Sequence, residues 1–282
     1  MHSSLAVPFT SMYEFDDPTA DIIISSSALE SHPRQFRLHS CILAVASPFF
    51  RDMFSLPQPP SNKTGVATLQ VSEISSTLDT LLRFVYPVVD PIVETLDELT
   101  AVLDAAVKYD FISTIQHLRK ILVEPRFVKS NPLRVFAIVA RYDFAEEIEI
   151  ASHSTLSTDI LDFPITDDLK YITAHTYRRL LDFRKRRACA AQDLLRLPYD
   201  VKCAQCNSGH AIYNAPKWWH EWVKRAKMES SLRPCTAVIF QTEFLVQAAA
   251  AADCPLCPGS MLESIRYLDE IRGRIDALPG TL

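Results

Sequence analysis

The sequence predicts an α+β domain in its first part and an all-helical region in the rest, which ends in a small cysteine-containing module. Three observations lead to this prediction. Short apolar runs typical of strands lie at 21–24, 35–38 and 66–71. Apolar residues at helical spacing follow from residue 78 onward. Two Cys-x-x-Cys pairs lie in the last third of the chain. A length of 282 residues suits about two domains. We divide the chain into an N-terminal tail (1–18), a first domain (19–125), a helical extension (126–200) and a cysteine-containing helical module (201–282).

The first two apolar runs predict a β-hairpin, since residues 25–33 between them have the composition of a turn or loop. The stretch that follows, FRLHSCILAVASPFFRDMF at 36–54, carries one apolar stripe at helical period. Its members are Ile42, Leu43, Ala46, Phe49, Phe50, Met53 and Phe54. Ser47-Pro48 interrupts the helix without changing the phase of the stripe, because Ser is a good N-cap and Pro fits a first helical turn. We therefore expect two short helices that share one buried face.

Further helices are predicted along the rest of this domain. An apolar helix spans Leu78 to Tyr86, and Thr95 with Glu98 forms a capping box that opens the next one. Ser113 is the expected cap of a third helix.

At this point four blocks resemble the BTB/POZ family in the order in which that family has them. LHSCILAVASPFFRDMF is similar to the family's central signature, Asp21–Ile24 to its first strand, Leu81–Tyr86 to a helix end and Ala105–Tyr109 to a later helix. The Pro-rich loop at 56–65 and the segment after Tyr86 resemble the fungal branch. The resemblance implies an α+β domain used for protein–protein contact, often by self-association, and not for catalysis.

The resemblance leaves more specific roles open. An adaptor of a cullin-type ubiquitin ligase is one alternative, although the hydrophobic-x-Glu motif of many cullin-binding members is replaced by the Pro-rich loop after Phe54. A transcription-related regulator is another, although the family's charged groove pairs a strand Asp, here Asp21, with a basic residue at the position of Ser40. Phe9, Tyr13, Phe15 and the exposed side of the 36–54 helices are candidates for the contact surface.

Beyond residue 125 the pattern is helical throughout. Asn131-Pro132 starts one helix, Asp143 with Glu146 forms a capping box for another, and 167–195 supplies one long or two shorter helices. This arrangement is similar to the helical extension that often follows BTB domains. The basic run Arg184–Arg187 is either a nuclear import patch or, as we prefer in an acidic protein, a solvated helix face.

The strongest chemical signal is the pair of motifs Cys203-x-x-Cys206 and Cys254-x-x-Cys257. One turn with this spacing presents two thiolates to one ion, and four sulfur ligands suit tetrahedral zinc. Gly209 and Gly259 follow the two pairs and ease the turns. We predict a structural zinc held by these four cysteines. Variants that use His210 or Cys235, and free or redox-active thiols, are the alternatives.

Helices are predicted at 216–228, with three tryptophans on one face, at 236–251 and at 261–275. We interpret the tryptophans as core of this module rather than as a ligand cage.

Composition argues against other functions. The net charge is −5 and the isoelectric point about 5.9, which gives nucleic acid no general attraction. The chain has only 5 glycines and no phosphate-binding Gly-rich motif, and a four-ligand zinc site has no open position for catalysis. We expect a non-enzymatic interaction protein that acts as scaffold or adaptor, with protein partners or a second copy of itself.

The competing hypothesis is a zinc-containing nucleic-acid-binding regulator, for which Lys217, Lys224, Arg225 and Lys227 would supply the charge. The first residues lack the pattern of a signal peptide, and no long apolar run occurs. Seven cysteines without a secretory signal suit a reducing compartment. We therefore expect an intracellular protein without a membrane span, in the cytoplasm, the nucleus or both.

Overall fold

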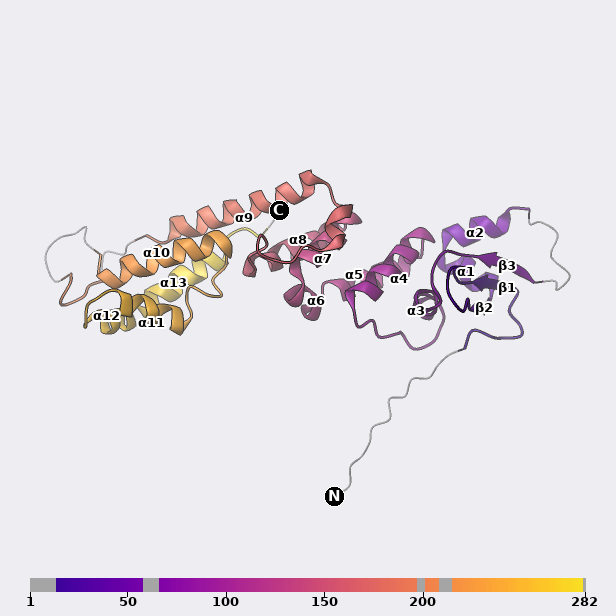
Figure 1. The fold of residues 1–282 in the computed structure, drawn as a ribbon, viewed down its shortest axis with the longest axis horizontal. Helices are drawn as coiled ribbons and strands as arrows, with labels where there is room; N and C mark the ends of the chain where they lie inside the picture. Colours follow the sequence, from indigo (N-terminus) through magenta and orange to yellow (C-terminus); the bar gives the residue numbers. More distant parts are fainter. Residues whose placement is uncertain (1–13, 58–65, 197–200, 208–214, 281–282) are drawn as a thin grey trace, which may run out of the picture. The chain divides into compact units, whose positions relative to one another are not determined.

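The computed structural model describes residues 14–57, 66–196, 201–207 and 215–280, and their internal contacts divide the chain into two compact units, 1–122 and 123–282 (Figure 1). Each unit is described by itself. The first is an α+β domain, as predicted, and the second contains helices. Within the described residues, no helix is both long and apolar enough to cross a membrane. The predicted further division at residue 200 stays a prediction.

The first unit is organised around a three-stranded sheet in the order β2-β1-β3. Its strands are β1 (Ile22–Ser25), β2 (Gln35–Leu38) and β3 (Ala67–Gln70). The predicted hairpin is confirmed: β1 and β2 are antiparallel, with Ile22 opposite Leu38. β3 lies parallel to β1 on the other side. Alternate side chains, such as Phe36 and Leu38, are fully buried because successive strand residues point to opposite faces.

The described residues of this unit also form five helices: α1 (Ser40–Ala46), α2 (Pro48–Ser55), α3 (Ser75–Val85), α4 (Leu96–Lys108) and α5 (Ile112–Leu122). The predicted restart between α1 and α2 is confirmed. Buried Ser47 accepts a hydrogen bond from Phe50 N–H at 3.1 Å, as an N-cap does, and its hydroxyl donates to Tyr109 O at 2.5 Å. Thr95 caps α4 as predicted. Ser113 does not cap α5, which already begins at Ile112.

The second unit begins with α6 (Pro125–Ser130), α7 (Pro132–Arg141), α8 (Ala145–Ser154), the short 3-10 helices η1 (Thr155–Ser157) and η2 (Asp167–Tyr171), and the long α9 (Ala174–Leu194). The helix start at Asn131-Pro132 is confirmed. The capping box at Asp143 is wrong: Asp143 has φ 56°, in the left-handed region, and forms the turn that ends α7. α8 begins only at Ala145, without a side-chain cap.

The rest of the second unit consists of α10 (Lys217–Leu232), α11 (Thr242–Ala251), α12 (Cys257–Glu263) and α13 (Ile265–Asp276). Two expectations are corrected here. The segment 236–241 is not helical, so α11 begins six residues later than predicted. The predicted helix at 261–275 is two helices, because the chain leaves helical geometry at Ser264. α9, α10 and α13 pack together around a core that contains all three tryptophans (Figure 1).

Candidate metal centre and interaction surface

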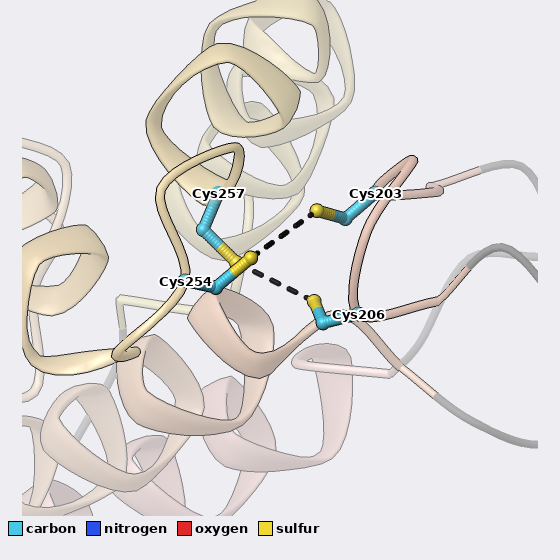
Figure 2. Close-up of side chains that lie close together, drawn as sticks. All are labelled: Cys203, Cys206, Cys254 and Cys257. Carbon is cyan, nitrogen blue, oxygen red and sulfur yellow. Dashed lines mark hydrogen bonds between the residues drawn. The ribbon is translucent and has the colours of Figure 1, made fainter.

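The four predicted cysteines come together at one point of the second unit (Figure 2). Cys203 and Cys206 lie in the turn that precedes α10, Cys254 lies between α11 and α12, and Cys257 is the first residue of α12. Cys203 Sγ is 3.7 Å from Cys254 Sγ, and Cys206 Sγ is 3.6 Å from Cys257 Sγ. All four sulfurs lie within 4.8 Å of one another.

These separations suit a tetrahedral metal ion. Zinc–sulfur bonds of about 2.3 Å place the corners of a tetrahedron about 3.8 Å apart, close to the two measured distances. A disulfide needs about 2.05 Å, and these four cysteines form no disulfide. Cys203, Cys254 and Cys257 are buried, so a bound ion would be largely shielded from water. The cluster could therefore hold a metal ion with four protein ligands.

The positive end of α10 supports negative charge on the sulfurs. The backbone N–H of Lys217 lies 3.4 Å from Cys206 Sγ, and the backbone N–H of Trp218 bonds the sulfur of Cys257. Free N–H groups in the first turn of a helix, together with the helix dipole, stabilise anions. The same arrangement would orient the thiolates and reduce their charge when a metal is bound.

The thiols differ in how readily they ionise. Burial opposes ionisation of Cys203, yet backbone N–H groups of Cys206 and Gln205 bring the pKa of Cys203 to about 7. Burial raises the pKa of Cys257 to about 12, and the neighbouring sulfurs Cys206 and Cys254 add to this. Four thiolates in one small volume repel one another, so a bound cation would favour complete ionisation.

Two consecutive hydrogen bonds connect the elements around the sulfurs. Trp218 Nε1–H donates to Ser260 Oγ at 3.0 Å, and Ser260 Oγ–H donates to Lys202 O at 2.6 Å. These bonds join α10, α12 and the segment that carries Cys203. Trp222 Nε1–H bonds Ile239 O at 2.9 Å, and both rings are fully buried. The prediction that the tryptophans are core residues is confirmed.

Of the alternative ligands, His210 and the neighbouring Gly209 lie outside the described residues. Cys235 does not belong to the cluster among the residues that the structure describes. Burial raises the pKa of its thiol, which makes Cys235 a poor ligand by itself.

The basic run Arg184–Arg187 is only partly a solvated helix face, which corrects the prediction. Lys185 and Arg186 are exposed, but Arg184 and Arg187 are buried and donate to backbone carbonyls. Arg184 reaches Thr155 O, Thr158 O and Leu232 O, the last of which belongs to the C-terminal residue of α10. Because Arg184 and Arg187 are buried and bonded to backbone carbonyls, their side chains are not accessible to an import receptor.

The burial of Arg184 and Arg187 could have been predicted from their helical spacing, although a run of four charged residues suggests exposure. Arg184 and Arg187 share the helical face of Leu180, Ala188 and Ala191, all of which are buried. Burial lowers the pKa of Arg184 to about 10, so the guanidinium remains charged at neutral pH.

In the first unit, α1 and α2 expose three apolar side chains next to the charged residues Arg51 and Asp52 of α2. Cys41 and Val45 are four residues apart on α1 and share one face, Phe49 follows on α2, and Val45 is 89% exposed. Phe15 is not part of a surface, because it is buried against Phe36 and Tyr86. Phe9 and Tyr13 lie outside the described residues.

In the family's charged groove, the partner of Asp21 is here Ser40, which carries no charge. Ser40 N–H and Oγ–H both donate to the Asp21 carboxylate, at 2.7 and 2.5 Å.

Comparison with models of protein families matches residues 16–126 to the BTB/POZ domain. A search among curated proteins finds no match.

Proposed function

From the premise that residues 16–126 are a BTB/POZ domain, we propose that this protein is a non-catalytic scaffold or adaptor that works by protein–protein contact. The family match carries the proposal, since BTB domains are interaction modules. The contact is either self-association or binding of a partner, and we infer that it forms inside the cell. Adaptors of cullin-type ligases fall within the same proposal.

The surface that we assign to self-association is the stripe Cys41, Val45 and Phe49 on α1 and α2. An exposed valine gains about 1.5–3 kcal/mol when it is buried. In a two-fold symmetric dimer the same residue is buried twice, so its contribution counts from both copies.

Sedimentation velocity of the full chain at micromolar concentration tests this assignment. We expect a dimer for the unchanged protein and a monomer for Val45→Glu, because a buried unpaired carboxylate opposes association. Leu29→Glu is the matched control, since Leu29 is 97% exposed in a loop of the same unit. The assignment fails if the unchanged protein sediments as a monomer throughout, or if Val45→Glu assembles normally.

We also propose that Cys203, Cys206, Cys254 and Cys257 bind one structural zinc ion. The ion would supply positive charge and join two turns on either side of the α10–α11 pair, with no position left open for substrate. Elemental analysis of the purified full chain should find about one zinc per chain. The proposal fails if the purified protein contains no zinc and if excess zinc does not raise its stability above that of the metal-free protein.

A further inference from the structure

The cysteine cluster has one member that is more accessible than the other three. Cys206 is half-buried, whereas Cys203, Cys254 and Cys257 are buried. Oxidation of a cysteine follows the thiolate character and the exposure of its sulfur, and all four sulfurs are thiolates when they bind zinc. A small oxidant that diffuses to the centre therefore meets Cys206 first.

We propose that Cys206 is a site of oxidative modification by hydrogen peroxide and that Cys257 completes the reaction by forming a disulfide with it. The product replaces a metal bridge between two turns by a covalent one. The inference goes beyond the composition of the metal centre, and it rests on the proposed function in one respect, which is the zinc ion that the oxidation releases.

Cys257 is the partner of Cys206 because the sulfurs face one another across the two motifs (Figure 2). Cys206 Sγ lies 3.6 Å from Cys257 Sγ, and Cys203 Sγ faces Cys254 Sγ at 3.7 Å. A disulfide bond is about 2.05 Å long, so a closing movement of roughly 1.5 Å joins the sulfurs of Cys206 and Cys257. The buried contact between Cys203 and Cys254 is left as two thiols.

The first turn of α10 holds both reacting sulfurs. The backbone N–H of Lys217 lies 3.4 Å from Cys206 Sγ, and the backbone N–H of Trp218 bonds the sulfur of Cys257. Two sulfurs that bond successive N–H groups of one helix end meet at the same point. The sulfur of Cys257 is therefore in position when the sulfur of Cys206 has reacted.

The reaction balances with one molecule of peroxide. The sulfur of Cys206 attacks one oxygen, the O–O bond breaks, and the sulfur becomes a sulfenic acid while hydroxide leaves. The sulfur of Cys257 then attacks the sulfur of Cys206, the S–O bond breaks, and a second hydroxide leaves. Two protons from solvent convert both hydroxides to water. Each sulfur loses one electron, and the peroxide takes up both.

The disulfide also removes two of the zinc ligands. A disulfide sulfur carries no negative charge, and zinc is bound by thiolates, so oxidation releases the ion. Cys206 and Cys257 are 51 positions apart in the sequence, so the new bond keeps distant segments together after the ion is lost. A dithiol reductant reverses the bond by exchange, and the site then binds zinc again.

Treatment of the full, zinc-loaded chain with an equimolar amount of hydrogen peroxide tests the inference. A chromogenic chelator measures released zinc. Non-reducing electrophoresis isolates single chains, whose remaining thiols are alkylated before digestion and mass spectrometry. We expect a disulfide between Cys206 and Cys257 as the first product, with release of about one zinc ion per oxidised chain. The peptides of Cys203 and Cys254 should carry the alkyl label.

An exposed thiol outside the cluster provides a control. Cys189 is exposed and does not belong to the cluster among the residues that the structure describes. Cys189→Ser should therefore change the rate of zinc release by less than about twofold, because the effects of surface substitutions are small.

Two substitutions by histidine separate the two facing contacts. Histidine is an ordinary zinc ligand, so Cys257→His and Cys254→His each keep four ligands and remove one thiol. We expect Cys257→His to lose the disulfide product and to accumulate a sulfenic acid at Cys206 that dimedone traps. Cys254→His is the matched control and should still join Cys206 to Cys257. The zinc content of each variant is measured first, and the disulfide map of the unchanged chain decides the inference if a variant does not fold.

Three outcomes would overturn the inference: a first disulfide that joins Cys203 to Cys254, a first disulfide within one Cys-x-x-Cys motif, or an unmodified Cys206 after peroxide has oxidised other thiols. An equal yield of disulfide in Cys257→His would remove Cys257 from its assigned role. The zinc content before treatment tests the proposed function, and the disulfide map after treatment tests this inference, so the two fail separately.

Discussion

Replacement of Arg187 by alanine tests whether the buried arginines of α9 hold the second unit together. Its guanidinium donates to Leu278 O at 2.7 Å, Pro279 O at 3.0 Å, Ile275 O at 3.2 Å and Pro234 O at 3.3 Å. The first three carbonyls follow the last turn of α13 or belong to it, where intrahelical donors are missing. One side chain therefore caps a helix end and binds the segment after α10.

The expected cost follows from these bonds. A hydrogen bond from a charged donor contributes about 1.5–3 kcal/mol, so four would sum to roughly 6–12 kcal/mol. The substitution also removes a buried charge, whose desolvation opposes folding by several kcal/mol, and this partly offsets the loss. Some of the freed carbonyls will bind water. We therefore expect Arg187→Ala to lower the free energy of unfolding of this unit by about 3 kcal/mol.

Urea unfolding followed by tryptophan fluorescence measures this quantity. All three tryptophans lie on α10, so their emission reports on the second unit alone. With a urea dependence of about 2 kcal/mol per molar, the midpoint should fall by about 1.5 M. Arg186→Ala, one residue away and exposed, should change stability by less than about 0.5 kcal/mol. Coincident midpoints for the two variants would refute the capping role of Arg187.

Three other predictions concern the metal centre and the first unit. Chelation of metal, or Cys203→Ser, should lower the urea midpoint of tryptophan fluorescence, whereas Cys189→Ser, at an exposed lone thiol, should leave it unchanged. Burial opposes ionisation of Glu73, but hydrogen bonds from Lys108 and Tyr109 lower the pKa of Glu73 overall. The contribution of ionised Glu73 to stability should therefore be complete above the unfolded carboxyl pKa of about 4.3 and be lost as pH falls through the lower folded pKa. Glu73→Gln should reduce this pH dependence of the melting temperature, measured by circular dichroism between neutral and acidic pH. Ser47→Ala should cost about 1–2 kcal/mol in thermal or urea unfolding of the first unit, because it removes the cap of α2 and the bond to Tyr109 O.

Sequence patterns predicted the first unit well where the signals were local. The two strands of the hairpin, the Ser47-Pro48 restart and the Thr95 cap each depend on residues a few positions apart. Periodicity and capping act over that range, so the sequence contains them directly. The errors arose where the same residue type serves two purposes. Asp is a residue type that often caps helices, but Asp143 occupies the left-handed turn after α7. Asp tolerates this conformation better than most residues do.

The last module shows the limit of local signals more clearly. An apolar pattern at 261–275 continues through Ser264, yet α12 and α13 are separate helices. α12 carries Cys257 of the cysteine cluster and Ser260, which bonds Trp218, whereas α13 packs against α9. Sequence periodicity reports which residues are apolar and does not report a change of helix direction within one apolar run.

The sequence by itself determined the class of the first domain, the four cysteines and their spacing within each pair, and the apolar faces of the helices. Only the tertiary structure decided that Cys203 meets Cys254 across 51 positions at 3.7 Å, because that distance depends on how α10 and α11 fold back on each other. The structure also decided which members of the basic run turn inward. Charge predicts exposure for an isolated helix, but carbonyls freed at helix ends are strong acceptors, and their positions are a property of the assembled fold.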